Sequence, residues 1–164
     1  MKVIMDSDSL IKLTKAKAKE IVVKNIEAYI PPLVFDETVK VPKKEGFPDA
    51  FLIEENVEKG FLTIGKFIYD AQLEEMINEL GLGKGESDVF RLYKQGGFDV
   101  ISSDDSKFLK IIDAFEIPYL TPTALIIYLF NKKVLTKEDA KLYINNLKEM
   151  ISDEEYYLSI KEVE

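Results

Sequence analysis

Two adjacent acids, Asp104 and Asp105, stand where an apolar run ends and an amphipathic run begins in the stretch VISSDDSKFL. The pattern predicts a buried strand followed by a helix, with two carboxylates at the junction. The same arrangement opens the chain, where Asp6 and Asp8 follow the apolar segment KVIM. An Asp in such a place either caps the following helix or belongs to a metal site at the carboxyl end of a parallel strand.

Two further segments supply paired acids. Asp36 and Glu37 lie in a predicted helix behind the second strand, and Glu86 and Asp88 lie in the first turn of another helix. Taken alone, each pair fits a helix cap, a first turn that complements the helix dipole, or a solvated face. Together, the four segments favour a site, because carboxylates held close together repel one another and a cation is their usual partner.

The residue types that are absent narrow the chemistry. The chain has no His and no Cys, which excludes a Ser-His-Asp triad, a cysteine nucleophile and a usual zinc site. Clustered carboxylates prefer hard cations, so Mg²⁺ or Mn²⁺ is the expected cofactor. Such ions lower the pKa of a bound water and stabilise a phosphate oxygen during hydrolysis.

Composition is that of a soluble globular protein. The 164 residues, 46% hydrophobic and 32% charged, fit a single domain over 1–164. The longest apolar run, ALIIYLF at 124–130, is much shorter than the ~20 residues that span a bilayer. The first residues lack the features of a secretory signal. We therefore expect no membrane association, and the absence of Cys fits a cytoplasmic location.

The net charge of −8 argues against a general nucleic-acid coat protein, because phosphate binding needs a basic surface. It does not exclude a nuclease, since local patches and metal ions can override the net charge. Two lysine-rich segments, 12–19 and 40–44, are candidate patches. Such a segment is more often a solvated face.

Strands alternate with helices along the chain, which predicts a three-layer α/β/α fold with a parallel sheet of about five short strands and helices on both faces. Ligands of such sheets bind beyond the carboxyl ends of the strands. The predicted strands lie at 2–5, 27–32, 61–67, 98–103 and 117–122. The predicted helices lie at 7–26, 33–40, 48–60, 70–80, 86–95, 104–115, 123–133, 136–151 and 152–164.

Four motifs resemble, in order, those of the PIN-domain family. VIMDSDSLIKL at 3–13 looks like the family's first strand, which ends in an Asp followed by small hydroxyl residues. YIPPLVFDETV at 29–39 resembles the second motif, and Glu37 falls on its glutamate. GKGESDVFRLYKQGG at 83–97 resembles the Gly-Glu-x-Glu helix of an archaeal and bacterial branch, and VISSDDSKFLKI at 100–111 matches the fourth motif.

The resemblance implies a PIN-like fold and a Mg²⁺- or Mn²⁺-dependent endoribonuclease, commonly the toxin of a bacterial or archaeal toxin–antitoxin pair. RNA is then the substrate, and a second copy of the chain and a small antitoxin protein are the implied partners. The resemblance assigns the metal ligands and catalytic residues to Asp6, Glu37, Asp88 and Asp105.

Other residues of the four motifs are secondary candidates. By the same resemblance, Ser7 and Ser103 would orient a carboxylate or a phosphate, and Glu86 and Asp104 would bind the metal or support its ligands. The chain departs from the family at Asp8, where a small polar residue is preferred, and at Asp88, where this branch has Glu. Both departures keep or add negative charge, so the site retains its acidic character.

Two other interpretations remain open. DSDS at 6–9 also resembles the Asp-x-Asp opening of haloacid-dehalogenase-type phosphatases, in which Asp6 would be the nucleophile and Asp8 the general acid/base. Leu10 departs from that pattern, and no lysine is clearly placed in the required loop. The second alternative is a catalytically inactive PIN-like binding module, because a fold does not determine a function.

Overall fold

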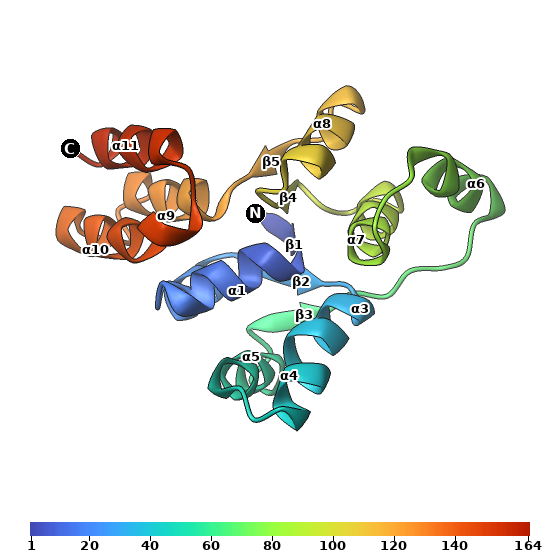
Figure 1. Ribbon diagram of the computed structural model, residues 1–164, viewed down its shortest axis with the longest axis horizontal. Helices are drawn as coiled ribbons and strands as arrows, with labels where there is room; N and C mark the ends of the chain where they lie inside the picture. Colours follow the sequence, from blue (N-terminus) through green and yellow to red (C-terminus); the bar gives the residue numbers. More distant parts are fainter.

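A parallel sheet lies at the centre of the protein, which is described over residues 1–164 by a computed structural model (Figure 1). The sheet has the strand order β3-β2-β1-β4-β5, and all neighbouring strands are parallel. The strands are β1 (Lys2–Met5), β2 (Glu27–Ile30), β3 (Leu62–Ile64), β4 (Val100–Ser102) and β5 (Tyr119–Leu120). The predicted parallel sheet of short strands is confirmed.

The central strand is β1, which pairs with strands on both sides. Val3 lies opposite Ala28 of β2 and Val100 of β4. Val3, Ile4 and Met5 are fully buried, because a central parallel strand is covered on both faces and is therefore apolar throughout. The strand ends at Met5, so Asp6 is the first residue at the carboxyl edge of the sheet.

Helices cover both faces of the sheet. The α-helices are α1 (Ser7–Lys15), α2 (Lys19–Asn25), α3 (Pro32–Phe35), α4 (Val41–Lys44), α5 (Pro48–Glu58), α6 (Ala71–Leu80), α7 (Lys84–Lys94), α8 (Ser106–Ala114), α9 (Pro122–Asn131), α10 (Lys137–Leu147) and α11 (Asp153–Glu162). In Figure 1, α1 and α9 lie on one side of the strands and α7 and α8 on the other. This arrangement confirms the predicted three-layer fold.

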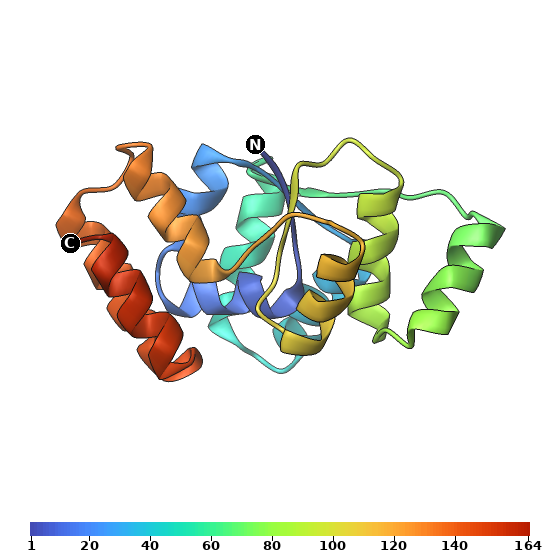
Figure 2. The same cartoon turned by 90° about the horizontal axis from the view of Figure 1, so that it is seen from above.

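The two ends of the molecule are formed by helices that do not cover the centre of the sheet. Figure 2 shows α6 at one end beside α7, and α10 with α11 at the other end beside α9.

No helix of the protein is both long enough and apolar enough to cross a membrane. The hydrophobic core joins both layers, and its largest fully buried side chains are Phe90 of α7 and Phe108 of α8.

The helix predicted at 7–26 is wrong as a single element, because the chain breaks it into α1 and α2. Lys17 has a left-handed backbone with φ of 62°, and the Ala18 N–H donates to the Leu13 carbonyl at 3.0 Å. This is the hydrogen bond of a helix end that usually has Gly at the left-handed position. The Asn146 side chain of α10 donates to a carbonyl at the break and stabilises it.

Other element boundaries also differ from the prediction. The helix predicted at 33–40 is α3 followed by a π-helical turn, η1 (Asp36–Lys40), and then by α4. The helix predicted from Glu86 begins at Lys84, since Gly83 is its N-cap. Asp88 therefore lies in the second turn of α7. The helix predicted at 136–151 ends at Leu147 and continues as a 3₁₀ turn, η2 (Lys148–Met150).

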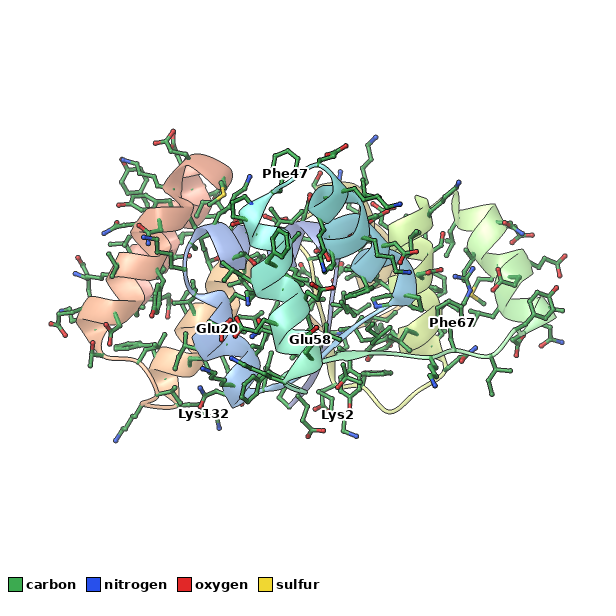
Figure 3. The ribbon with its side chains drawn as sticks, turned by 90° about the horizontal axis from the view of Figure 1, so that it is seen from below. Lys2, Glu20, Phe47, Glu58, Phe67 and Lys132 are labelled. Carbon is green, nitrogen blue, oxygen red and sulfur yellow. The ribbon has the colours of Figure 1, made fainter.

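A buried lysine joins α2 to α5. Lys19 is only 2% exposed, and its ammonium donates to the Leu52 carbonyl at 2.9 Å, to Glu20 Oε1 at 2.7 Å and to the Asn56 side-chain oxygen. Figure 3 shows Glu20 beside α5, where it accepts from the Asn56 amide at 2.8 Å. Burial lowers the pKa of Lys19, and the Glu20 carboxylate opposes that shift.

We expect Asn56→Ala to lower the free energy of unfolding by about 2–3 kcal/mol, because it removes an acceptor from a buried charged donor. Urea unfolding followed by circular dichroism measures the change. Asn25→Ala is the matched control, since Asn25 is exposed and bonds only the Ile21 carbonyl; its expected effect is within about 0.5 kcal/mol. Equal effects of the two substitutions would contradict a stabilising role for the Lys19 network.

Candidate active site

An acidic cleft of about 230 Å³ lies beyond the carboxyl ends of β1 and β4. No hydrophobic side chain lines it. The lining residues are Asp6, Ser7, Asp8, Glu37, Gly83, Gly85, Glu86 and Asp105. The structure therefore brings together acids from all four segments that the sequence singled out.

The helices α1, α7 and α8 begin at this cleft, and two of its acids are the N-caps of α1 and α8. Asp6 is the N-cap of α1, and its Oδ1 accepts from the Ser9 N–H at 2.7 Å. Asp105 is the N-cap of α8, and its Oδ1 accepts from Lys107 N–H at 2.9 Å and Phe108 N–H at 2.8 Å. The cap and the site interpretations are thus compatible, because each hydrogen bond set fixes a carboxylate at the mouth of the cleft.

Two glutamates form the other side of the cleft. Glu37 of η1 accepts from the Ser7 hydroxyl at 2.5 Å, and Glu86 of α7 accepts from the Gly83 N–H at 2.8 Å. Gly85 lets Glu37 approach the backbone of α7, since a Cβ there would lie 3.3 Å from Glu37 Oε2. The protein hydrogen bonds of both glutamates use Oε2, which leaves one oxygen of each carboxylate available to a ligand.

Asp6 is the buried acid of the site. The residue is 8% exposed, and burial raises the pKa of its carboxyl to about 6, although the Ser103 hydroxyl and the Ser9 N–H lower it. Ser103 is fully buried, and its hydroxyl also accepts from the Asp105 N–H at 3.2 Å. Ser103 therefore lies between Asp6 and Asp105.

Asp88 and Asp104 do not line the cleft, although the sequence analysis placed both among the site candidates. Asp104 forms an ion pair with Lys12 of α1. Asp88 forms an ion pair with Arg91 one turn later in α7. Burial raises the pKa of Asp88, and the Arg91 guanidinium lowers it. Sequence reasoning did not anticipate either cation, because neither pairing follows from a motif.

Several lysines of the two lysine-rich segments are paired or buried, while Lys15, Lys17 and Lys44 are exposed. Lys12 pairs with Asp104 and Lys19 is buried. Lys40 lies 2.5 Å from an oxygen of Asp36, and Lys43 lies 2.6 Å from an oxygen of Glu54. No lysine lines the cleft.

The donor set of the cleft fits a hard divalent cation, because its side chains offer only carboxylate and hydroxyl oxygens. Buried Asp6 is a further argument, since a carboxylate taken out of water needs a compensating charge. The acids stand apart from one another, however, and no three of them are close enough to hold one ion. Repulsion between like charges favours this spacing, so a shared cation would require some of the side chains to rotate inward.

Sequence reasoning missed Ser9 and the two cleft glycines, Gly83 and Gly85. The GKG residues at 83–85 were assigned to the Gly-Glu-x-Glu motif, but with the helix expected to begin at Glu86, whereas Gly83 is the N-cap of α7. The signal for this role was present, because Glu86 stands three residues after Gly83, as in a capping box. Ser9 stands three residues after Asp6, where an N-cap side chain finds its N–H donor.

The comparison with protein families agrees with this architecture. A family model described as a PIN domain matches residues 2–164. A search of curated proteins finds no match. PIN domains are a nuclease fold, and their nucleases typically use divalent metal ions. The match confirms the resemblance to the PIN-domain family and disfavours the haloacid-dehalogenase alternative. Its extent, together with the parallel sheet and the acidic cleft at its carboxyl edge, shows that the chain belongs to the PIN-domain family.

Proposed function

We propose that the protein is a Mg²⁺- or Mn²⁺-dependent endoribonuclease that hydrolyses phosphodiester bonds in the acidic cleft. The observation that carries the proposal is the convergence of Asp6, Glu37, Glu86 and Asp105 on one cleft that no hydrophobic side chain lines. These acids would hold the metal. Asp88, one turn beyond Gly85 in α7, is the remaining ligand candidate and is paired with Arg91.

The side chains around the acids have defined roles in this proposal. Ser7 fixes Glu37 through a 2.5 Å hydrogen bond, and Ser103 lies between Asp6 and Asp105. The N-termini of α1, α7 and α8 stabilise negative charge at the cleft by about 0.3–1 kcal/mol each. A divalent cation bound there would polarise a phosphate oxygen and lower the pKa of a water molecule. The chain itself supplies no histidine for proton transfer.

Asp8 lines the cleft but is exposed, in contrast to buried Asp6. This arrangement disfavours the phosphatase alternative, in which Asp8 would be a general acid/base. That chemistry also needs a lysine beside the nucleophile, and none lines the cleft. A catalytically inactive PIN-like binding module is the other alternative, and assays of Mn²⁺ binding and RNA cleavage by the wild type distinguish it from the nuclease.

RNA as the substrate, a role as the toxin of a toxin–antitoxin pair and a homodimeric state are narrower proposals. They are supported by the motif resemblance, above all by the Gly-Glu-x-Asp segment at 85–88. A neighbouring short reading frame for a small DNA-binding protein would support the toxin role. Light scattering of the purified protein tests the dimer.

We expect Asp6→Asn to reduce Mn²⁺-dependent cleavage of a structured-RNA pool at least about a hundredfold, since even groups that support metal ligands contribute 10–100-fold. Asn keeps the N-cap hydrogen bond of α1. The matched control is Asp70→Asn, because Asp70 caps α6 in the same way at 3.0 Å from the Leu73 N–H but lies outside the cleft. Wild-type protein that neither binds Mn²⁺ at millimolar concentration nor cleaves RNA would refute the nuclease and favour the binding module.

The buried carboxyl of Asp6 makes stability depend on pH. Its pKa is raised from 3.8 to about 6 by burial, so the stability it contributes is full below pH 3.8 and is lost as the pH rises through about 6. Without metal, we therefore expect Asp6→Asn to be more stable than wild type at pH 8 by up to about 3 kcal/mol.

Chemical unfolding in EDTA at pH 4 and pH 8 measures this difference. Most of the gain at pH 8 should disappear at pH 4, where the Asp6 carboxyl of the folded wild type is protonated and neutral. Mn²⁺ added in place of EDTA should stabilise only the wild type at pH 8. Asp6→Asn that is less stable than wild type at pH 8 in EDTA would contradict the unfavourable burial of the Asp6 charge.

A further inference from the structure

Arg91 of α7 pairs with two acids, Glu74 and Asp88, that do not line the acidic cleft. Its Nε and Nη2 lie 2.5 and 2.7 Å from the two carboxylate oxygens of Glu74 in α6, while Nη1 pairs with Asp88. The ring of Phe67 lies 4.9 Å from the guanidinium, and Figure 3 shows Phe67 beside α7. Only 12% of the arginine side chain is exposed, so solvent screens these contacts less than it screens a surface ion pair.

Asp88 lies next to the cleft, although it does not line it. Gly85, three residues earlier on the same face of α7, lines the cleft and approaches Glu37. At the contact between α7 and α3, burial raises the pKa of Asp88, while Arg91 and the backbone N–H of Leu33 lower it. Leu33 in turn lies one helical turn before Glu37.

The partners of Arg91 are unequal. The pair with Glu74 is bidentate, whereas the pair with Asp88 uses a single nitrogen. If the Asp88 side chain rotates away, Arg91 keeps Glu74 and the face of Phe67, so no cation is left without a partner. The rotation therefore loses one hydrogen bond and leaves no uncompensated charge behind.

We propose that Arg91 is a positioning residue, an internal counter-ion that competes with the divalent cation for Asp88. Asp88 would join the other metal ligands by exchanging the guanidinium for the cation, and Glu74 would favour this exchange by retaining Arg91. This inference rests on the proposed metal-dependent function and extends it, because it assigns the control of metal affinity to a pair of residues outside the cleft.

A structural role and this role predict different effects on metal affinity. Arg91→Gln and Glu74→Gln both break the ion pair between α6 and α7, so a purely structural contact would shift the affinity for Mn²⁺ in the same direction in both variants. Competition predicts opposite directions. Arg91→Gln frees Asp88 and should tighten Mn²⁺ binding, whereas Glu74→Gln leaves Arg91 with Asp88 as its remaining carboxylate and should weaken it.

Isothermal titration of the full-length protein with MnCl₂ tests the proposal. We expect a dissociation constant about tenfold lower for Arg91→Gln and several-fold higher for Glu74→Gln, in the range seen when groups behind metal ligands are changed. Lys94→Gln controls for the loss of one positive charge from α7 and should leave the constant near that of wild type. Arg91→Gln combined with Asp88→Asn should lose the gain. Thermal unfolding of each variant verifies the fold.

The outcomes separate this inference from the function on which it rests. Wild type that binds Mn²⁺ with unchanged or weaker binding in Arg91→Gln overturns the competition and leaves the nuclease proposal intact. Opposite shifts in the two single variants support it. Absence of binding in both wild type and Arg91→Gln overturns both proposals, because removing the competitor would then reveal no metal site.

Discussion

The architecture depends on a constraint of parallel sheets: every strand ends at the same edge, and the helix that follows begins there with unsatisfied backbone N–H groups. At the cleft of this protein, carboxylates accept hydrogen bonds from such groups. Asp6 and Asp105 accept from the first turns of α1 and α8, and Glu86 accepts from the N-cap of α7. The capping of three helix N-termini thus brings negative charge together at one place. The same hydrogen bonds fix the direction of each carboxylate.

Two opposing influences therefore act on the ionisation of the acids in the cleft. Helix N-termini and hydroxyl groups favour ionised acids, whereas burial and mutual repulsion disfavour them. At Asp6, burial dominates. Outside the cleft, side-chain cations compensate the acids: Lys12 pairs with Asp104, and Arg91 pairs with Asp88. The acids that lack such a counter-charge are those that line the cleft, which is the distribution expected of a site that receives its positive charge from outside.

Sequence patterns were sufficient for the fold and for most of the cleft, because both follow from local rules. The short apolar runs marked the strands, and the acids that follow within three residues marked the sheet edge, as Asp6 and Asp105 illustrate. The patterns failed where a distant residue decides the structure. Lys17 takes a left-handed conformation that Asn146, far along the chain, helps to stabilise. The pairing of Arg91 with Glu74 of α6 likewise depends on how α6 packs, which no local pattern encodes.

The position of β1 has a consequence for the time course of folding. It is the first strand to be synthesised and the central strand of the sheet, yet Val3 finds its partner Val100 of β4 only 97 residues later, the same separation as between Lys2 and Asp99. At a synthesis rate of about 5–20 residues per second, β1 waits about 5–20 s for that neighbour. During this interval only the β1–β2 side of the sheet can form. The part of the cleft that contains Asp6 and Glu37 can therefore assemble before Asp105 is available to close it.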